Sequence, residues 1–144
     1  MLKLDARIEY RDKRNLLTPE KVNVLSEQIF NVFFQNFDIS KYENVHFFNT
    51  ITKMKEVNTS FFVNTLLEKH PNINLITSVS DINSNFLTHY IVNKDTVYVE
   101  NLFRIPEPTN GIKINENEIP KHDIFGMFLE TETLCKMAIV DCFC

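Results

Sequence analysis

The sequence predicts an α/β fold, a three-layer α/β/α sandwich with a mixed, mostly parallel sheet. Two helical patterns open the chain, and a strand–helix–strand alternation follows them, which is typical of a crossover between parallel strands. Two further apolar segments flank a polar turn at 93–95, which favours an antiparallel hairpin. The expected helices cover 2–17, 19–35 and 59–70, and the expected strands cover 45–48, 75–79, 86–92, 96–99 and 123–128.

Local signals set the expected ends of the helices. Thr18 is a good N-cap, Pro19 suits the first helical position, and Glu20 favours the positive end of a helix. Thr59 is expected to cap the third helix, which His70-Pro71 ends. The expected buried positions of the second and third helices are Val22, Leu25, Ile29, Val32, Phe33, Phe62, Val63, Leu66 and Leu67.

Composition indicates one globular domain, 1–144, large enough to bury a core. A net charge of −4 argues against general nucleic-acid binding, because excess Lys and Arg hold a phosphate backbone. No apolar run approaches the ~18 residues of a membrane span, and no signal-peptide pattern opens the chain. We expect a cytoplasmic monomer with no nucleic-acid or membrane partner. Its three cysteines, Cys135, Cys142 and Cys144, are expected to be reduced thiols.

Glycine is scarce, with only Gly111 and Gly126 where average usage of about 7% would give about ten. Both glycine-rich nucleotide fingerprints, the dinucleotide turn and the P-loop, are therefore absent. Any nucleotide site in this chain has to be built from other residues.

The segment Lys53-Met54-Lys55-Glu56-Val57-Asn58-Thr59 is the first candidate site. It follows an apolar strand, and in open α/β sheets ligands gather at the loops that leave strand ends. The carboxylate of Glu56 could accept hydrogen bonds from a heterocyclic ligand while Lys53 and Lys55 attract an anion. The alternative is a solvated loop whose lysines merely offset the glutamate.

A cationic helix face is the second candidate. Lys3, Arg7, Arg11 and Arg14 share one side of the first helix, and such a face could bind the phosphates of a nucleotide. The alternative is a solvated basic face that nearby acidic residues partly neutralise.

The segment Ile105-Pro106-Glu107-Pro108 is the third candidate, because two prolines stiffen it and could make it a pocket wall. By itself, such a double-proline segment is more often just a turn, and a turn is what we expect here. The four histidines, at 46, 70, 89 and 122, are scattered, and no metal or catalytic role is expected for them.

Taken in order, these motifs resemble the 5-formyltetrahydrofolate cyclo-ligase (5,10-methenyltetrahydrofolate synthetase) family. The resemblance covers about 3–123, and 124–144 diverges. The matching motifs are Lys3…Arg7, Tyr10, Lys13-Arg14, Leu17-Thr18-Pro19-Glu20, Val45-His46-Phe47-Phe48-Asn49, Lys55-Glu56-Val57-Asn58-Thr59, Leu87-Thr88-His89-Tyr90 and Ile105-Pro106-Glu107-Pro108.

The resemblance implies an enzyme, a ligase of folate and one-carbon metabolism. It would close 5-formyltetrahydrofolate to 5,10-methenyltetrahydrofolate with ATP and Mg²⁺, releasing ADP and phosphate. By the same resemblance, Lys3 and Arg7 bind ATP. The folate site would comprise Asn49, Glu56 and the segment Ile105, Pro106, Glu107 and Pro108.

The C-terminal segment departs from the family pattern. The family carries a glycine-rich loop there that cradles the phosphates, and 124–144 contains no such loop. We therefore expect a C-terminally truncated member, with the folate side kept and the nucleotide side lost. The alternatives are a catalytically inactive folate-binding remnant, and an α/β interaction domain whose basic helix meets an acidic partner.

Overall fold

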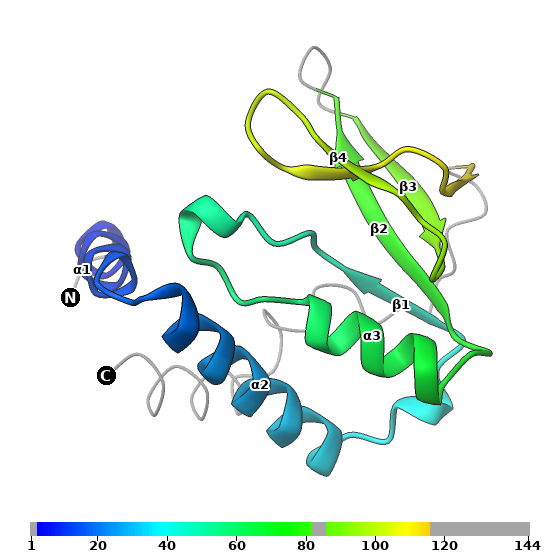
Figure 1. The fold of residues 1–144 in the computed structure, drawn as a ribbon, viewed down its shortest axis with the longest axis horizontal. Helices are drawn as coiled ribbons and strands as arrows, with labels where there is room; N and C mark the ends of the chain where they lie inside the picture. The colour runs from blue at the N-terminus through cyan, green and yellow to red at the C-terminus, as the bar shows by residue number, and fades with distance from the viewer. Residues whose placement is uncertain (1–2, 82–85, 116–144) are drawn as a thin grey trace.

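The computed structural model of the chain describes residues 3–81 and 86–115 (Figure 1). Three α-helices and two short 3-10 turns accompany six strands in this part of the chain. The helices are α1 (Lys3–Asn15), α2 (Pro19–Asn36) and α3 (Ser60–Lys69), and the 3-10 turns are η1 (Ile39–Lys41) and η2 (Thr52–Met54). The strands are β1 (Asn44–Phe47), β2 (Asn74–Ser80), β3 (Leu87–Val92), β4 (Tyr98–Glu100), β5 (Pro106–Pro108) and β6 (Ile112–Ile114).

Four of the strands form one sheet in the order β1-β2-β3-β6, and β4 and β5 form a separate two-stranded ribbon. β1 and β2 are parallel, whereas β2–β3 and β3–β6 are antiparallel. The predicted α/β fold with a mixed sheet is confirmed. The expectation of a mostly parallel sheet does not hold for the described strands, because only the β1–β2 connection contains a crossover helix.

The predicted hairpin between 86–92 and 96–99 is wrong. β3 pairs with β6 instead, and β4 pairs with β5. The side chain of Asn93 accepts a hydrogen bond from the Asp95 N–H, and Asn110 accepts one from the Val97 N–H. These bonds turn the chain out of the sheet after β3, so the ribbon is an excursion between two paired strands.

The chain returns to the sheet at Gly111, one of its two glycines. A Cβ at this position would lie 3.1 Å from Cβ of Tyr90 and 3.2 Å from the carbonyl oxygen of Ile91, both in β3. Only glycine allows this approach without a shift of the neighbouring backbone. Sequence analysis missed β6 because its two isoleucines lie in a polar stretch.

The core lies between one face of the sheet and helices α2 and α3 (Figure 1). Residues that are paired across β1, β2 and β3 supply the sheet side of this core, and rings from both helices supply the other. The rings of Phe30 and Phe62 stack with centroids 5.4 Å apart, which joins α2 to α3. The main buried members are Phe30, Phe33, Val45, Phe47, Phe62, Leu66, Leu75 and Val92.

The helix signals were accurate at most ends. Thr18 caps α2 by accepting a hydrogen bond from the Lys21 N–H, and His70 ends α3. Leu25, Ile29 and Phe33 are buried as predicted, as are Phe62 and Leu66. Four other expected core residues, Val22, Val32, Val63 and Leu67, are only partly buried.

The expected strand at 123–128 and the divergent segment 124–144 lie outside the described residues. The helices that the structure describes on one face of the sheet make two of the three expected layers. Within the described part of the chain, no helix is both long enough and apolar enough to cross a membrane.

Candidate functional site

The loop between β1 and α3 is held by its own side chains. The hydroxyl of Thr50 donates to the carbonyl oxygen of Val57 at 2.8 Å and accepts from the Thr59 N–H at 2.9 Å. The hydroxyl of Thr59 donates to the carbonyl oxygen of Phe48 at 3.0 Å. These bonds cross the base of the loop, so residues 50–58 form a closed, ordered lobe after the strand.

The predicted cap of α3 needs a correction. Thr59 precedes the helix but makes no side-chain capping bond, because its hydroxyl reaches back to β1. Asn58 takes over part of this role, since its Oδ1 accepts from both the N–H and the hydroxyl of Ser60. Thr59 therefore links the loop to the segment that follows β1, and it does not cap α3.

Glu56 faces into this lobe. Its Oε2 accepts a hydrogen bond from the Ile51 N–H at 2.9 Å, and the residue is half-buried. A carboxylate offers about four acceptor positions on two oxygens, so this bond takes up only part of its capacity. The side chain is thus both fixed in place and able to accept hydrogen bonds from a ligand.

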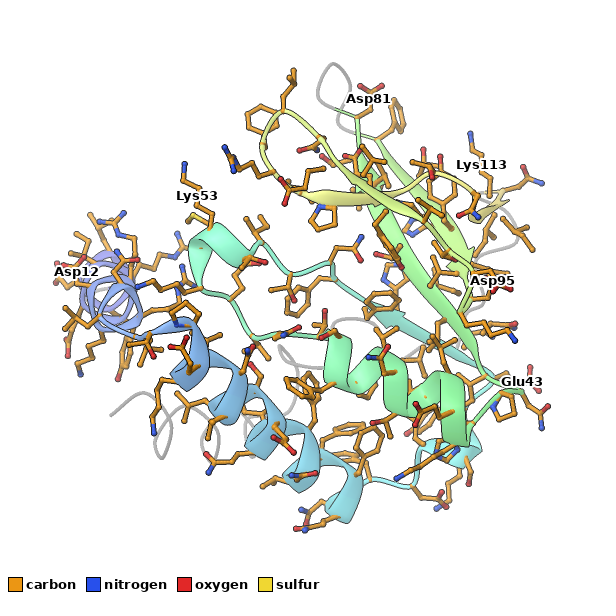
Figure 2. All side chains as sticks on the ribbon, viewed as in Figure 1. Asp12, Glu43, Lys53, Asp81, Asp95 and Lys113 are labelled. Atoms are coloured by element: carbon orange, nitrogen blue, oxygen red, sulfur yellow. The ribbon has the colours of Figure 1, made fainter. Side chains whose placement is uncertain are left out.

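The two lysines of the loop do not act together as expected. Lys55 has φ of 52°, and its ammonium donates to the carbonyl oxygens of Asn15 and Leu17 at 2.6 Å each. It therefore holds the junction between α1 and α2, and it is not a spare cation for an anionic ligand. Lys53 extends outward from η2 (Figure 2).

The structure brings two predicted site segments together across the chain. Nδ2 of Asn49, just after β1, donates to the carbonyl oxygen of Pro106 at 2.9 Å. These residues are 57 positions apart, and the bond is partly buried. The bond therefore holds the proline segment next to the end of β1, where the lobe that contains Glu56 begins.

The proline segment is a strand and not the turn that sequence analysis expected. Pro106, Glu107 and Pro108 make up β5, with Glu107 paired to Val99 of β4. Prolines are tolerated here because the extended backbone suits their fixed φ and a two-stranded ribbon leaves them an open edge. Ile105 comes directly before the strand and is half-buried.

The turn lies just before β5 and is organised by Asn101. Its Oδ1 accepts from the N–H groups of Phe103 and Ile105, and its Nδ2 donates to Oε1 of Glu107 at 2.6 Å. Glu107 is thus engaged in holding the turn. Arg104 at the tip has φ of 61°, a backbone conformation that favours glycine.

Of the predicted ATP residues, Arg7 makes no hydrogen bond or ion pair to this site among the described residues. Arg7 is exposed on α1, and the loop reaches α1 through the hydrogen bond from Lys55 to the carbonyl oxygen of Asn15. That Lys3 and Arg7 bind ATP stays a prediction. Within 3–81 and 86–115, no group of three or more His, Cys, Asp or Glu side chains could hold a metal ion.

Sequence analysis missed a polar cluster on the sheet face opposite α2 and α3, in which two histidines are buried and a serine is partly buried. His46, Ser78 and His89 come from β1, β2 and β3, and their polar atoms lie 3.0 Å from one another. The histidines are 43 positions apart, so their spacing in sequence gave no signal. Burial, with a smaller effect of His89, lowers the pKa of His46 to about 4.

The arrangement of these elements is also found in a solved structure of another protein. A solved structure with this fold is the NMR structure of 5,10-methenyltetrahydrofolate synthetase from Aquifex aeolicus, with a TM-score of 0.62 and 24% sequence identity. The match covers 82% of this chain but 57% of that one. No family model matches the sequence, and no curated protein does.

Proposed function

We propose that the chain binds a reduced folate, 5-formyltetrahydrofolate, and acts as a cyclo-ligase that closes it to 5,10-methenyltetrahydrofolate with Mg-ATP. The carrying observation is the hydrogen bond from Asn49 to Pro106, which joins two of the motifs that suggested the folate site. The shared fold with the Aquifex synthetase supports the class of ligand.

The proposal assigns each element a part in binding. Glu56 accepts hydrogen bonds from amino and ring N–H groups of the pterin, because its carboxylate is fixed by Ile51 yet keeps acceptor capacity. The β4–β5 ribbon forms a wall, positioned by Asn49. The hydrogen bond between Asn101 and Glu107 sets the shape of that wall, so Glu107 acts on the folate only indirectly.

The chemistry needs more than binding. Phosphorylation makes the formyl oxygen a good leaving group, and an enzyme then has to hold N10 against the activated carbon. Cations near the phosphates would come from Lys3 and Arg7. The low glycine count favours a second candidate, a folate-binding protein without turnover.

Glu56→Gln is the most direct test of the folate site. Its amide oxygen can still accept from Ile51, so the lobe stays closed while the charge is lost. We expect the Kd for 5-formyltetrahydrofolate, measured by calorimetry, to rise about tenfold, the loss of roughly one charged hydrogen bond. The matched control is Glu68→Gln, an exposed glutamate on α3.

A spectrophotometric assay of methenyltetrahydrofolate formation with Mg-ATP separates the two candidates. Turnover supports the cyclo-ligase. Binding without turnover supports the non-catalytic binder. If wild-type protein shows no saturable folate binding, or if Glu56→Gln binds as tightly as Glu68→Gln, the folate site is refuted.

A further inference from the structure

The outer edge of β4 has no partner strand in the part of the chain that the structure describes. There β4 pairs with β5 alone, in a two-stranded ribbon. Val97 and Asn101 make backbone hydrogen bonds toward the β5 side. In an antiparallel pair, the N–H and C=O groups of the intervening residues point the opposite way. The backbone groups of Tyr98 and Glu100 therefore form an open edge.

The outer edge of β5, by contrast, is blocked by its two prolines. Pro106 lies opposite Glu100, and Pro108 lies opposite Tyr98. By the same alternation, the nitrogens of both prolines lie on the side away from β4, and a proline nitrogen carries no proton to donate. Proline and lysine commonly protect exposed strand edges from pairing, and β4 contains neither of them. The ribbon thus has one protected edge and one open edge.

The open strand also carries exposed apolar side chains. Val97 and Val99 lie on the same face of the ribbon, because side chains alternate along a strand, and they are 55% and 56% exposed. A two-stranded ribbon is only marginally stable by itself, and further strands with an apolar face stabilise it. The edge therefore suits an extended strand that brings apolar side chains to these valines.

A second copy of β4 meets this requirement. In an antiparallel register with Tyr98 on the two-fold axis, the two Tyr98 residues exchange their N–H···O=C bonds. Val97 then lies opposite Val99 of the second copy, so four valines gather on one face. Glu100 lies opposite Thr96 of the second copy, and no like charges face each other. An axis at Glu100 would instead place two glutamates opposite each other.

We propose that the chain forms a symmetric dimer in which β4 pairs with β4 of a second copy. The product is one four-stranded sheet in the order β5-β4-β4-β5. Both of its outer edges are the proline-blocked edges of β5, so assembly stops at two chains. Few residues meet on each side, and such small interfaces are weak, with an expected Kd of about 10–100 µM. The pairing does not rest on the proposed folate site.

Sedimentation equilibrium of the full chain, in reducing buffer from about 10 µM to about 1 mM, measures the association. We expect a monomer–dimer equilibrium with no larger species. Val99→Lys should raise its Kd about tenfold or more, because it places a charge against the apolar side chain of Val97. The matched control is Val24→Lys, which makes the same change at a valine on α2 that is 48% exposed and should leave the Kd unchanged.

A second measurement uses only the wild-type protein. Amide hydrogen exchange of Tyr98 and Glu100 should slow severalfold between concentrations below and above the Kd, while exchange in α2 stays the same. The monomer that composition led us to expect, if it persists up to about 1 mM, overturns the proposal. A dimer in which these two amides exchange at the monomer rate also overturns it, as does equal dimerisation of Val99→Lys and Val24→Lys.

Discussion

Gly111→Ala tests the return of the chain from the ribbon to the sheet. The added methyl group would lie 3.1 Å from Cβ of Tyr90 and 3.2 Å from the carbonyl oxygen of Ile91, where ordinary contacts are about 3.5–4.0 Å. Neither atom can rotate away, because one belongs to the backbone and the other is bonded to it. β6 therefore has to move away from β3 by a few tenths of an ångström.

The magnitude follows from two opposing effects. Overpacking of this kind costs about 1–3 kcal/mol. Replacing glycine by alanine also restricts the unfolded chain, which offsets about 0.4–1 kcal/mol. We expect a net loss of about 1–2 kcal/mol in the free energy of unfolding, or roughly 3–6 °C in Tm for a chain of this size.

Urea denaturation followed by circular dichroism measures this loss as a lower midpoint. The matched control is Arg104→Gly, which removes a side chain where φ is 61° and the residue is exposed. Relief of left-handed backbone strain stabilises the folded state by about 1–2 kcal/mol, and the greater conformational freedom of glycine in the unfolded chain offsets about half of this. We therefore expect the midpoint of Arg104→Gly to stay the same or rise slightly. An unchanged or higher midpoint for Gly111→Ala would refute the close approach of β6 to β3.

Three further predictions test single contacts. Thr77 is fully buried in β2, and its hydroxyl has no hydrogen-bond partner among the described residues. Thr77→Val should therefore raise the free energy of unfolding, measured in urea, by about 1 kcal/mol. A decrease in the free energy of unfolding would show that the hydroxyl has a partner. Lys55→Met removes the hydrogen bonds to Asn15 and Leu17. It should speed amide hydrogen exchange in α1 but not in α3, and equal exchange rates of α1 in wild type and variant would contradict this. Because the folded pKa of His46 is about 4, below its ordinary 6.5, the unfolded state binds more protons between these values. Stability should therefore be full above pH 6.5 and fall by up to about 3 kcal/mol towards pH 4, and His46→Gln should flatten this slope.

Local signals explain what could be predicted from the sequence. Thr18 and Pro19 fix the start of α2, and His70-Pro71 fixes the end of α3, because capping depends on residues within one turn. The strands β1 and β2 were found as short apolar runs. In each case the physical cause lies within a few residues of its effect.

The pairing of β3 with β6 could not be predicted, because the partner of a strand depends on where the intervening chain goes. Asn93 and Asn110 redirect the chain through side-chain hydrogen bonds that resemble ordinary turn signals in sequence. A polar turn between two apolar runs favours a hairpin, and here that rule fails.

The candidate site divides in the same way. Asn49 and Pro106 were both named from motifs, yet only the fold shows that they touch. Lys55 was expected to attract an anion, and its structural role depends on carbonyl groups about forty positions away. The pairing of His46 with His89 needs the strand register, which periodicity alone does not give.

The β4–β5 ribbon separates the residues that stabilise the sheet from the residues that shape the wall of the proposed site. β3 and β6 form the sheet whatever the ribbon's tip contains, and doubling the length of such a loop costs only about 0.6 kcal/mol in closure entropy. The tip at 101–105 can therefore accumulate substitutions and insertions that change the wall beside Asn49 without endangering the core. This architecture would let the ligand preference of the proposed site change faster in evolution than the fold that carries it.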